Sequence, residues 1–203
     1  MESQSRFFKD GFRTGEEAYE ILSPHFHDII RCIHTPLDAV EELRQRESEF
    51  CQPVTSRSWA SIVHDHMEDE AKRVFGSAGS GIAVYTNTGF VVVDFDERIF
   101  LRFKKLRRNL SPCNIETDQQ RAFDSQTLFR GPVTLVTAGY RLDDVGVYKD
   151  AHIVCWAYGE LLWSLRLPDS EQGKRSEITV PPTTDQPIVV VRKSTAIKMG
   201  IAR

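Results

Sequence analysis

The most chemically distinctive part of the sequence is a basic stretch on a predicted β-strand. Residues 99–109 combine β-branched and aromatic side chains with five cations, a density of one charge sign that no other stretch reaches. Adjacent cations on a strand can bind phosphate, arginine through a bidentate fork and lysine as a point charge. We therefore predict that an anion binds here. The predicted binding residues are Arg102, Lys104, Lys105, Arg107, Arg108 and Asn109.

This strand is expected to form a β-hairpin with the strand before it. Residues 90–95 and 99–106 are rich in β-branched and aromatic side chains and flank the polar break Asp96-Glu-Arg98, which is a hairpin pattern. The register decides the character of the surface. If the numbers of paired residues sum to an even number, Asp94 shares a face with Arg102, and if the sum is odd, the two lie on opposite faces. We expect opposite faces and a purely cationic surface.

Carboxylates near a lysine raise the alternative of catalysis. A helix with acidic residues, a strand with aspartate and a neighbouring strand with lysine together resemble the PD-(D/E)XK nucleases, which implies Mg²⁺-dependent cleavage of nucleic acid. The candidate residues are Glu68, Glu70, Asp94, Asp96 and Lys104. The acidic-x-Lys tripeptide of that family is Arg102-Phe-Lys104 here, and a cation in place of a carboxylate repels a divalent metal. We therefore favour binding without catalysis, and expect no cofactor outside the nuclease alternative.

Polar residues after the basic strand are further candidates for a site. Amide side chains near cations can bind a nucleotide or the backbone of a partner, although most of them satisfy loops. The polar series is Asn109, Asn114, Thr117, Gln119, Gln120 and Gln126. Ser125-Gln-Thr-Leu-Phe129 resembles the bacterial sliding-clamp-binding peptide, with its glutamine one residue too close to the leucine. A non-enzymatic interaction module, either an inhibitor or a clamp binder, therefore stays open.

Other residue types that carry chemistry lack the required spacing. His64 and His66 do not form a His-Glu-x-x-His pattern, so no metal site is predicted. The four cysteines are far apart and form no Cys-x-x-Cys pair, so we expect free thiols. The chain has no glycine-rich phosphate loop of either standard spacing, which argues against an ATP- or NAD-binding enzyme.

The elements that must position these residues are helices first and mostly strands afterwards. Thr14 and Glu17 have capping-box spacing, Ser23-Pro24 and Thr35-Pro36 are helix starts, and an apolar stripe runs along residues 58–75. We expect helices at about 25–34, 37–49 and 58–75. The predicted strands are 82–85, 90–95, 99–106, 133–138, 152–158, 161–167 and a last strand or edge at 188–191. The pattern predicts an α+β fold with a mainly antiparallel sheet of 5–6 strands.

The expected organisation is a helical N-terminal region (1–54), an α+β core domain (55–168), and a linker with a C-terminal strand and tail (169–203). The formal net charge of −3 argues against a surface tuned throughout to nucleic acid but permits a local basic patch. The first ten residues lack a signal-peptide core, and nowhere do eighteen apolar residues run together. We expect a cytoplasmic protein that does not bind membranes.

Three segments carry a resemblance to a known group of proteins: Arg102-Phe-Lys-Lys-Leu106, Ala138-Gly-Tyr-Arg-Leu-Asp143 and Leu161-Leu-Trp-Ser-Leu165. Together they resemble a family of uncharacterised bacterial proteins from prophage and toxin–antitoxin-like loci. The likeness covers about residues 80–167 and implies a protein partner, an antitoxin or regulator. It makes Tyr140, Arg141 and Asp143 site candidates, because the glycine before Tyr140 lets the backbone turn. We accordingly expect a toxin-like or phage-defence-associated protein that binds an anionic partner, nucleic acid or nucleotide, through its basic strand.

Overall fold

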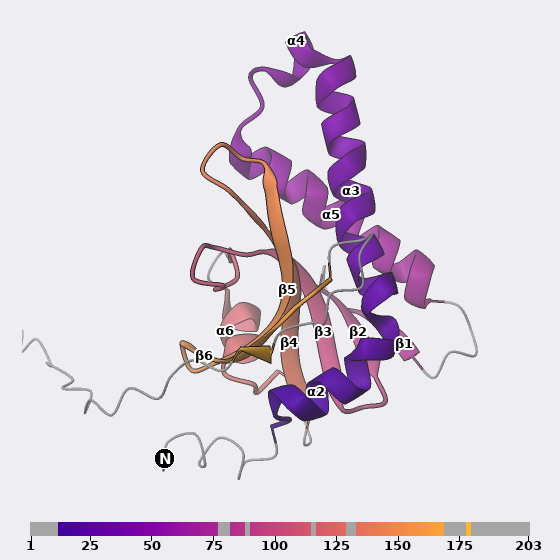
Figure 1. Cartoon of the computed structure of the whole chain (residues 1–203), viewed down its shortest axis with the longest axis vertical. Coiled ribbons are helices and arrows are strands. Elements are labelled where there is room, and N and C mark those ends of the chain that lie inside the picture. Colours follow the sequence, from indigo (N-terminus) through magenta and orange to yellow (C-terminus); the bar gives the residue numbers. More distant parts are fainter. Residues whose placement is uncertain are drawn as a thin grey trace, which may run out of the picture.

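The α+β fold class predicted from the sequence is confirmed. The computed structural model describes residues 12–76, 82–87, 90–114, 117–128, 133–168 and 178–179. The helices come first and are α2 (Gly15–Leu22), the 3₁₀ turn η1 (Ser23–His25), α3 (Phe26–Arg46), α4 (Ser48–Cys51) and α5 (Ser56–Phe75). The strands are β1 (Ile82–Asn87), β2 (Phe90–Phe95), β3 (Ile99–Lys105), β4 (Thr134–Leu142), β5 (Tyr148–Ala157), β6 (Glu160–Arg166) and the two-residue β7 (Ile178–Thr179), with the short helix α6 (Asp118–Asp124) between β3 and β4 (Figure 1).

The strands form one sheet in which the spatial order equals the chain order, β1 to β7. All neighbouring pairs are antiparallel except β3 and β4, which run parallel and are joined through α6. The predicted hairpins β2–β3 and β5–β6 are confirmed. The turn between β5 and β6 consists of Tyr158 and Gly159, both with positive φ, as a tight two-residue hairpin turn requires.

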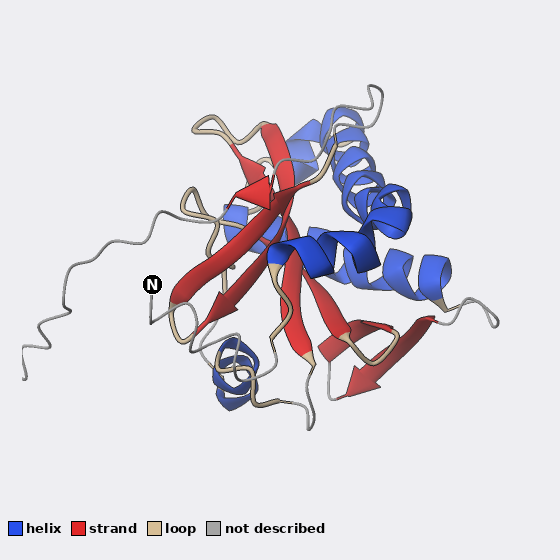
Figure 2. Cartoon of the chain, turned by 60° about the horizontal axis from the view of Figure 1, so that its bottom comes forward, coloured by secondary structure: helices blue, strands red, loops and turns tan. Residues whose placement is uncertain are grey.

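The two faces of the sheet are covered by different helices. Buried residues of α2, α3 and α5 pack with Val93, Leu101 and Phe103 on one face and form the main core. On the other face Phe123 of α6 packs with Phe100 and residues of β2 and β4. Most of the helices accordingly lie to one side of the twisted sheet (Figure 2). Because α2 and α3 share the main core with the sheet, this core extends across the boundary expected at residue 54.

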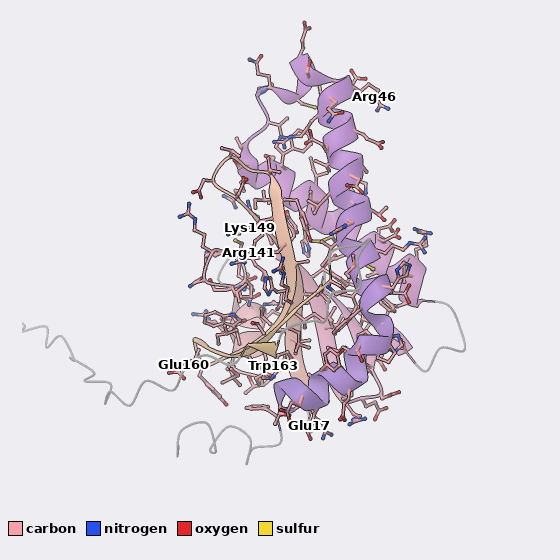
Figure 3. All side chains as sticks on the ribbon, viewed as in Figure 1. Glu17, Arg46, Arg141, Lys149, Glu160 and Trp163 are labelled. Carbon is pink, nitrogen blue, oxygen red and sulfur yellow. The ribbon has the colours of Figure 1, made fainter. Side chains whose placement is uncertain are left out.

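The start of α2 is held by a capping box and by a hydrogen bond from strand β6. The capping box is present, because Thr14 accepts from the Glu17 N–H and the Glu17 carboxylate accepts from the Thr14 N–H. Trp163 of β6 lies beside α2 (Figure 3), and its indole N–H donates to the carbonyl of Arg13 at 3.0 Å. Side chain and cap together hold the first helix against the last long strand.

The expectation of two helices separated at Thr35-Pro36 was wrong, because α3 continues through Pro36 without interruption. A proline inside a helix removes one backbone hydrogen bond and costs about 3 kcal/mol. Ile33, Pro36 and Val40 are all buried on the same side of the helix. Burying side chains of this size contributes about 1.5–3 kcal/mol each, so packing against the core outweighs the local cost.

Strand β4 also differs from the expectation, because it runs through Gly139 to Leu142 and does not turn at the glycine. A Cβ at position 139 would lie 1.9 Å from the carbonyl oxygen of Lys104 on β3. The glycine is therefore required for close approach of two parallel strands. Ile178 and Thr179, expected in a linker, pair with β6 as β7. The predicted strand at 188–191 lies outside the described residues.

Substitution of Gly139 tests the close contact between β3 and β4. We expect Gly139→Ala to lower the free energy of unfolding by at least about 2 kcal/mol, because backbone atoms cannot yield to the added methyl as a flexible side chain can. Gly146→Ala is the control: it has positive φ but open space around the position, so it should cost only about 1 kcal/mol. Urea denaturation measures both. Equal losses for the two variants would contradict this account of Gly139.

Candidate functional site

The β2–β3 register places Asp94 opposite Phe100. The residue numbers of this pair sum to an even number, so Asp94 shares a face with Arg102. The expectation of opposite faces was wrong. The reason lies in the core: Val93 and Leu101 both face the main core, which forces the even-numbered residues of both strands to the other side. The carboxylate of Asp94 accepts the N–H of Glu97 at 2.7 Å and so stabilises the hairpin turn.

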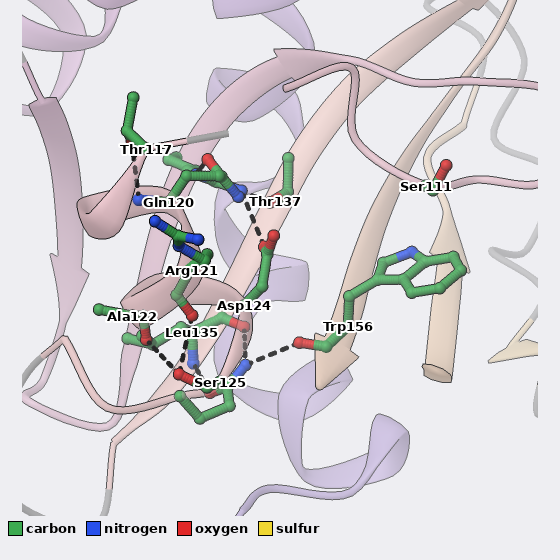
Figure 4. Close-up of polar contacts among 12 residues, drawn as sticks. Ser111, Thr117, Gln120, Arg121, Ala122, Asp124, Ser125, Leu135, Thr137 and Trp156 are labelled. Atoms are coloured by element: carbon green, nitrogen blue, oxygen red, sulfur yellow. Dashed lines mark hydrogen bonds and ion pairs between the residues drawn. The ribbon is translucent and has the colours of Figure 1, made fainter. Parts of the chain in front are cut away.

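Arg102 is buried, with only 2% of its surface exposed. Its guanidinium donates to Thr137 Oγ1 at 3.1 Å and to Gln120 Oε1, and lies 3.4 Å from a carboxylate oxygen of Asp124. Gln120, Asp124 and Thr137, which supply these three acceptors, are drawn in Figure 4. The guanidinium of Arg102 also lies over the ring of Phe123, 3.8 Å from its centroid. Burial lowers the pKa of Arg102 to about 10, and Asp124 opposes this shift. Arg102 therefore joins α6 to the sheet and is not a surface cation.

Lys104 projects from the same strand toward helix α5. Its Nζ lies 2.7 Å from Nε2 of His64, and the same Nε2 lies 3.2 Å from a carboxylate oxygen of Glu68. Burial lowers the pKa of Lys104 to about 8, with Arg102 adding to the shift, and burial together with Lys104 lowers the pKa of His64 to about 4. Burial also raises the pKa of Glu68. The 2.7 Å distance fits a hydrogen bond in which Nζ of Lys104 donates to Nε2 of a neutral His64 imidazole.

A cavity of about 510 Å³ opens beside this contact. Its walls come from the first half of α5, the end of β3, the loop that follows β3, and the start of α6. The lining residues are Ser56, Arg57, Ala60, Ser61, His64, Lys104, Lys105, Arg107, Cys113, Asn114, Thr117 and Gln120. Four of these are lysines or arginines, and none of the lining residues in the described part of the chain is acidic. The cavity is therefore strongly cationic in a protein whose net charge is negative.

The backbone around the cavity holds these side chains in place. Helix α5 begins here, capped by Thr55, so the positive end of its dipole lies at the wall. After β3 the chain folds back on itself: Leu106 pairs with Pro112, and the Cys113 N–H donates to the carbonyl of Lys105 at 2.8 Å. This return brings the exposed Cys113 next to the basic strand.

Several polar atoms at the cavity have no hydrogen-bond partner among the described residues. They are Nδ1 of His64, Oδ1 of Asn114 and Nε2 of Gln120. Gln120 is 6% exposed, and its Oε1 is already used by Arg102, which fixes the orientation of the amide. A buried polar atom without a partner costs about 1–3 kcal/mol, so a ligand that supplied partners here would gain affinity.

The predicted anion-binding residues are only partly brought together. Lys104, Lys105 and Arg107 line the cavity, whereas Arg102 lies behind Gln120. Arg108 points elsewhere and pairs with Asp144, both well exposed. Asn109 accepts from the N–H and the hydroxyl of Ser111 and so shapes the loop.

The other predicted site residues have structural contacts. Gln126 bridges separated strands, because its amide bonds to both backbone groups of Leu135 and to the carbonyl of Trp156. At 8% exposure, it is not presented as a clamp-binding peptide would be.

Tyr140 is buried in the main core, which raises its pKa to about 12. Asp143 accepts the N–H groups of residues 145 and 147 and closes the β4–β5 turn. Arg141 forms a two-pronged pair with Asp150.

The residues of the nuclease alternative are only partly gathered at one place: Glu68 and Lys104 both contact His64, but the two aspartates lie elsewhere. Asp94 lies opposite Phe100, and Lys104 is four residues further along β3, which corresponds to about 13 Å. Asp96 is exposed in the hairpin turn. Within the described ranges, no group of three or more histidine, cysteine or acidic residues could hold a metal ion.

Sequence reasoning missed the contributions of Arg57 and Ser61 and the pairing of His64 with Lys104. His64 and Lys104 are forty residues apart, so no local spacing could indicate their contact. Asn114, Thr117 and Gln120 belonged to the polar series recognised in the sequence, and all three do line the cavity.

Comparison with protein-family models, with curated proteins and with solved structures found no significant match. The resemblance to prophage and toxin–antitoxin proteins therefore stays a prediction. Across the ranges that the structure describes, every helix is too short or too polar to traverse a lipid bilayer.

Substitution of Arg102 tests its structural role. We expect Arg102→Met to lower the free energy of unfolding by about 2–4 kcal/mol, because Gln120 and Thr137 lose their buried donor. Arg121→Met is the matched control, since Arg121 pairs with Asp118 on the exposed side of α6 and should cost less than about 0.5 kcal/mol. Urea denaturation separates the two, and a loss for Arg102→Met no larger than the control would refute the role assigned to Arg102.

The pKa of His64 predicts a pH dependence of stability. His64 holds its proton less tightly in the folded state (pKa about 4) than at its ordinary 6.5, so the unfolded state binds more protons between these values. Stability therefore falls on acidification through this window, by about 2 kcal/mol from His64 alone. We expect His64→Gln to lose less stability than wild type between about pH 7 and pH 4.5, as measured by urea midpoints. His66→Gln, at an exposed position on the same helix, should behave like wild type; if instead His64→Gln and wild type lose the same amount, His64 is not desolvated.

Proposed function

We propose that the protein binds a compact, phosphate-bearing ligand in the cavity between α5, the end of β3 and α6. The observation that carries this proposal is the convergence of Arg57, Lys104, Lys105 and Arg107 on one cavity with no acidic residue among its described lining. Arg57 and Lys105 have no acidic partner among the described residues. Their charges are available to a ligand, unlike those of Arg102 and Arg108.

The surroundings favour an anion over other ligands. The positive end of the α5 dipole, equivalent to about half an elementary charge, adds to the side-chain cations. The hydroxyls of Ser56 and Thr117 and the amide of Gln120 supply hydrogen-bond donors. Phosphate oxygens accept from donors of both kinds, and charge-assisted hydrogen bonds of this type are about twice as strong as neutral ones.

The cavity also suggests the size and character of the ligand. A volume of about 510 Å³ falls in the range of small-molecule sites. Apart from the His64 ring, the described residues of the lining include no aromatic side chain on which a base could stack. Base stacking on aromatic side chains is a common part of single-strand recognition. A small ligand dominated by phosphate and hydroxyl groups therefore fits better than a nucleic-acid strand.

The biological setting is a further part of the proposal. A toxin-like or defence-associated role and a protein partner, and with them a cytoplasmic location, are supported only by the resemblance of three segments of the sequence. A phosphate-bearing ligand would be the anionic partner of such a protein.

Cys113 provides a direct test, because it lines the cavity and is exposed while the other three cysteines are buried. We expect pyrophosphate to slow alkylation of Cys113 by iodoacetamide, a neutral reagent, and added salt to weaken this protection through screening. Lys105→Gln and Arg107→Gln should each raise the pyrophosphate concentration needed for half-protection by about tenfold, the loss of one charge-assisted contact. Mass spectrometry of the Cys113 peptide follows the reaction.

Arg108→Gln is the matched control, since it removes a neighbouring cation that lies outside the cavity, and it should leave the protection unchanged. Sodium chloride at the same ionic strength as the pyrophosphate controls for bulk screening. Alkylation that proceeds at one rate with and without pyrophosphate would overturn the proposed function. A short single-stranded oligonucleotide that protects far better than pyrophosphate would overturn the preference for a compact ligand.

A further inference from the structure

Lys104 differs from the other cations at the cavity in its immediate contacts. Lys105, Arg107 and Arg57 surround the opening, whereas Nζ of Lys104 lies 2.7 Å from Nε2 of His64. The two nitrogens form a contact between a primary amine and an imidazole on the wall of a cationic cavity. Neither the binding of phosphate nor the stability of the fold requires this arrangement.

An amine must lose its proton before it can act as a nucleophile. Desolvation and a neighbouring cation are the two established ways of achieving this for lysine. Both apply to Lys104: it is partly buried, and Arg102 projects from the same face of β3. With a pKa of about 8, about a tenth of Lys104 is unprotonated at pH 7, against less than about a thousandth of an ordinary lysine.

We propose that Lys104 forms an imine with a phosphorylated aldehyde or ketone held in this cavity. The inference rests on the proposed function, because the surrounding cations and donors would hold the phosphate while the carbonyl carbon meets Nζ. It names the class of ligand: a compact phosphate ester that carries a carbonyl group.

The reaction is balanced without any other reactant. The Nζ lone pair attacks the carbonyl carbon, a C–N bond forms, and the carbonyl oxygen becomes the hydroxyl of a carbinolamine. Loss of that hydroxyl as water gives the imine, so one amine and one carbonyl yield one imine and one water. Nε2 of His64, already adjacent to Nζ, can relay the two protons that leave the nitrogen to the oxygen, the first to form the carbinolamine hydroxyl and the second to release that hydroxyl as water. Hydrolysis reverses the same steps.

Reductive trapping tests the inference, with pyridoxal 5′-phosphate as a phosphorylated aldehyde probe and cyanoborohydride to reduce the imine to a stable secondary amine. Peptide mapping by mass spectrometry should find Lys104 labelled about tenfold faster or more than the exposed lysines, in line with its larger unprotonated fraction. Pyridoxal, which lacks the phosphate, should label Lys104 about tenfold more slowly. Pyrophosphate should compete with the phosphorylated probe.

Lys104→Arg keeps the positive charge but cannot form the imine, so the fast labelling should disappear. Lys149→Arg is the matched control, because Lys149 is an exposed lysine on β5 (Figure 3), and it should leave the fast labelling intact. The inference would be overturned if wild-type Lys104 were labelled no faster than Lys149. It would also be overturned if pyridoxal and pyridoxal 5′-phosphate labelled Lys104 at equal rates. Both comparisons use the wild-type protein. If pyrophosphate protects Cys113 while Lys104 stays unlabelled, the inference fails and the proposed function stands. If pyrophosphate does not protect Cys113, the proposed function itself is refuted.

Discussion

The burial of one guanidinium group, that of Arg102, is the interaction on which the site depends. Removing this cation from water is unfavourable, and the structure offsets the cost with Gln120, Thr137, Asp124 and the ring of Phe123. Three of these four partners belong to α6. The helix has only seven residues and could not be stable alone, so Arg102 and the apolar contact of Phe123 largely hold it on the sheet. The α6 wall of the cavity exists because of this attachment.

The same buried charge acts on its neighbours through electrostatics. Arg102 and Lys104 are two residues apart on β3 and project from one face, so each disfavours the other's charge, and Arg102 lowers the pKa of Lys104 and of His64. Gln120 transmits a second effect: its Oε1 is engaged by Arg102, which leaves Nε2 at the cavity without a partner. A structural cation thus adds to the effect of burial on the pKa of Lys104 and sets the direction of an amide at the site.

Local patterns in the sequence were sufficient for the elements but not for the contacts between them. The hairpin β2–β3 and the helix α5 follow from alternation and from an apolar stripe. The register of the hairpin does not, because apolar residues stand at even positions (Val92, Phe100) as well as at odd positions of both strands. Pro36 and Gly139 misled because their local preferences are overridden by packing against the core and by the approach of a parallel strand. Lys104, Lys105 and Arg107 were recognisable as cations with phosphate chemistry, whereas the burial of Arg102 required knowledge of α6. The pairing of His64 with Lys104 joins segments forty residues apart, which no periodicity encodes.

The proposed reactivity of Lys104 would account for several groups at the cavity that do not stabilise the fold. Lys104 has a pKa of about 8 when folded, below its ordinary 10.5, so the unfolded state binds more protons between these values and the lysine opposes folding at neutral pH. His64 likewise opposes folding below about pH 6.5. The atoms of Asn114 and Gln120 that lack a hydrogen-bond partner among the described residues add to this free-energy cost. A methionine or leucine at position 104 would avoid this cost and still cover the edge of the core. Desolvation is, however, what makes the lysine amine available, so the property that weakens the fold at this position is the one that a reactive lysine requires.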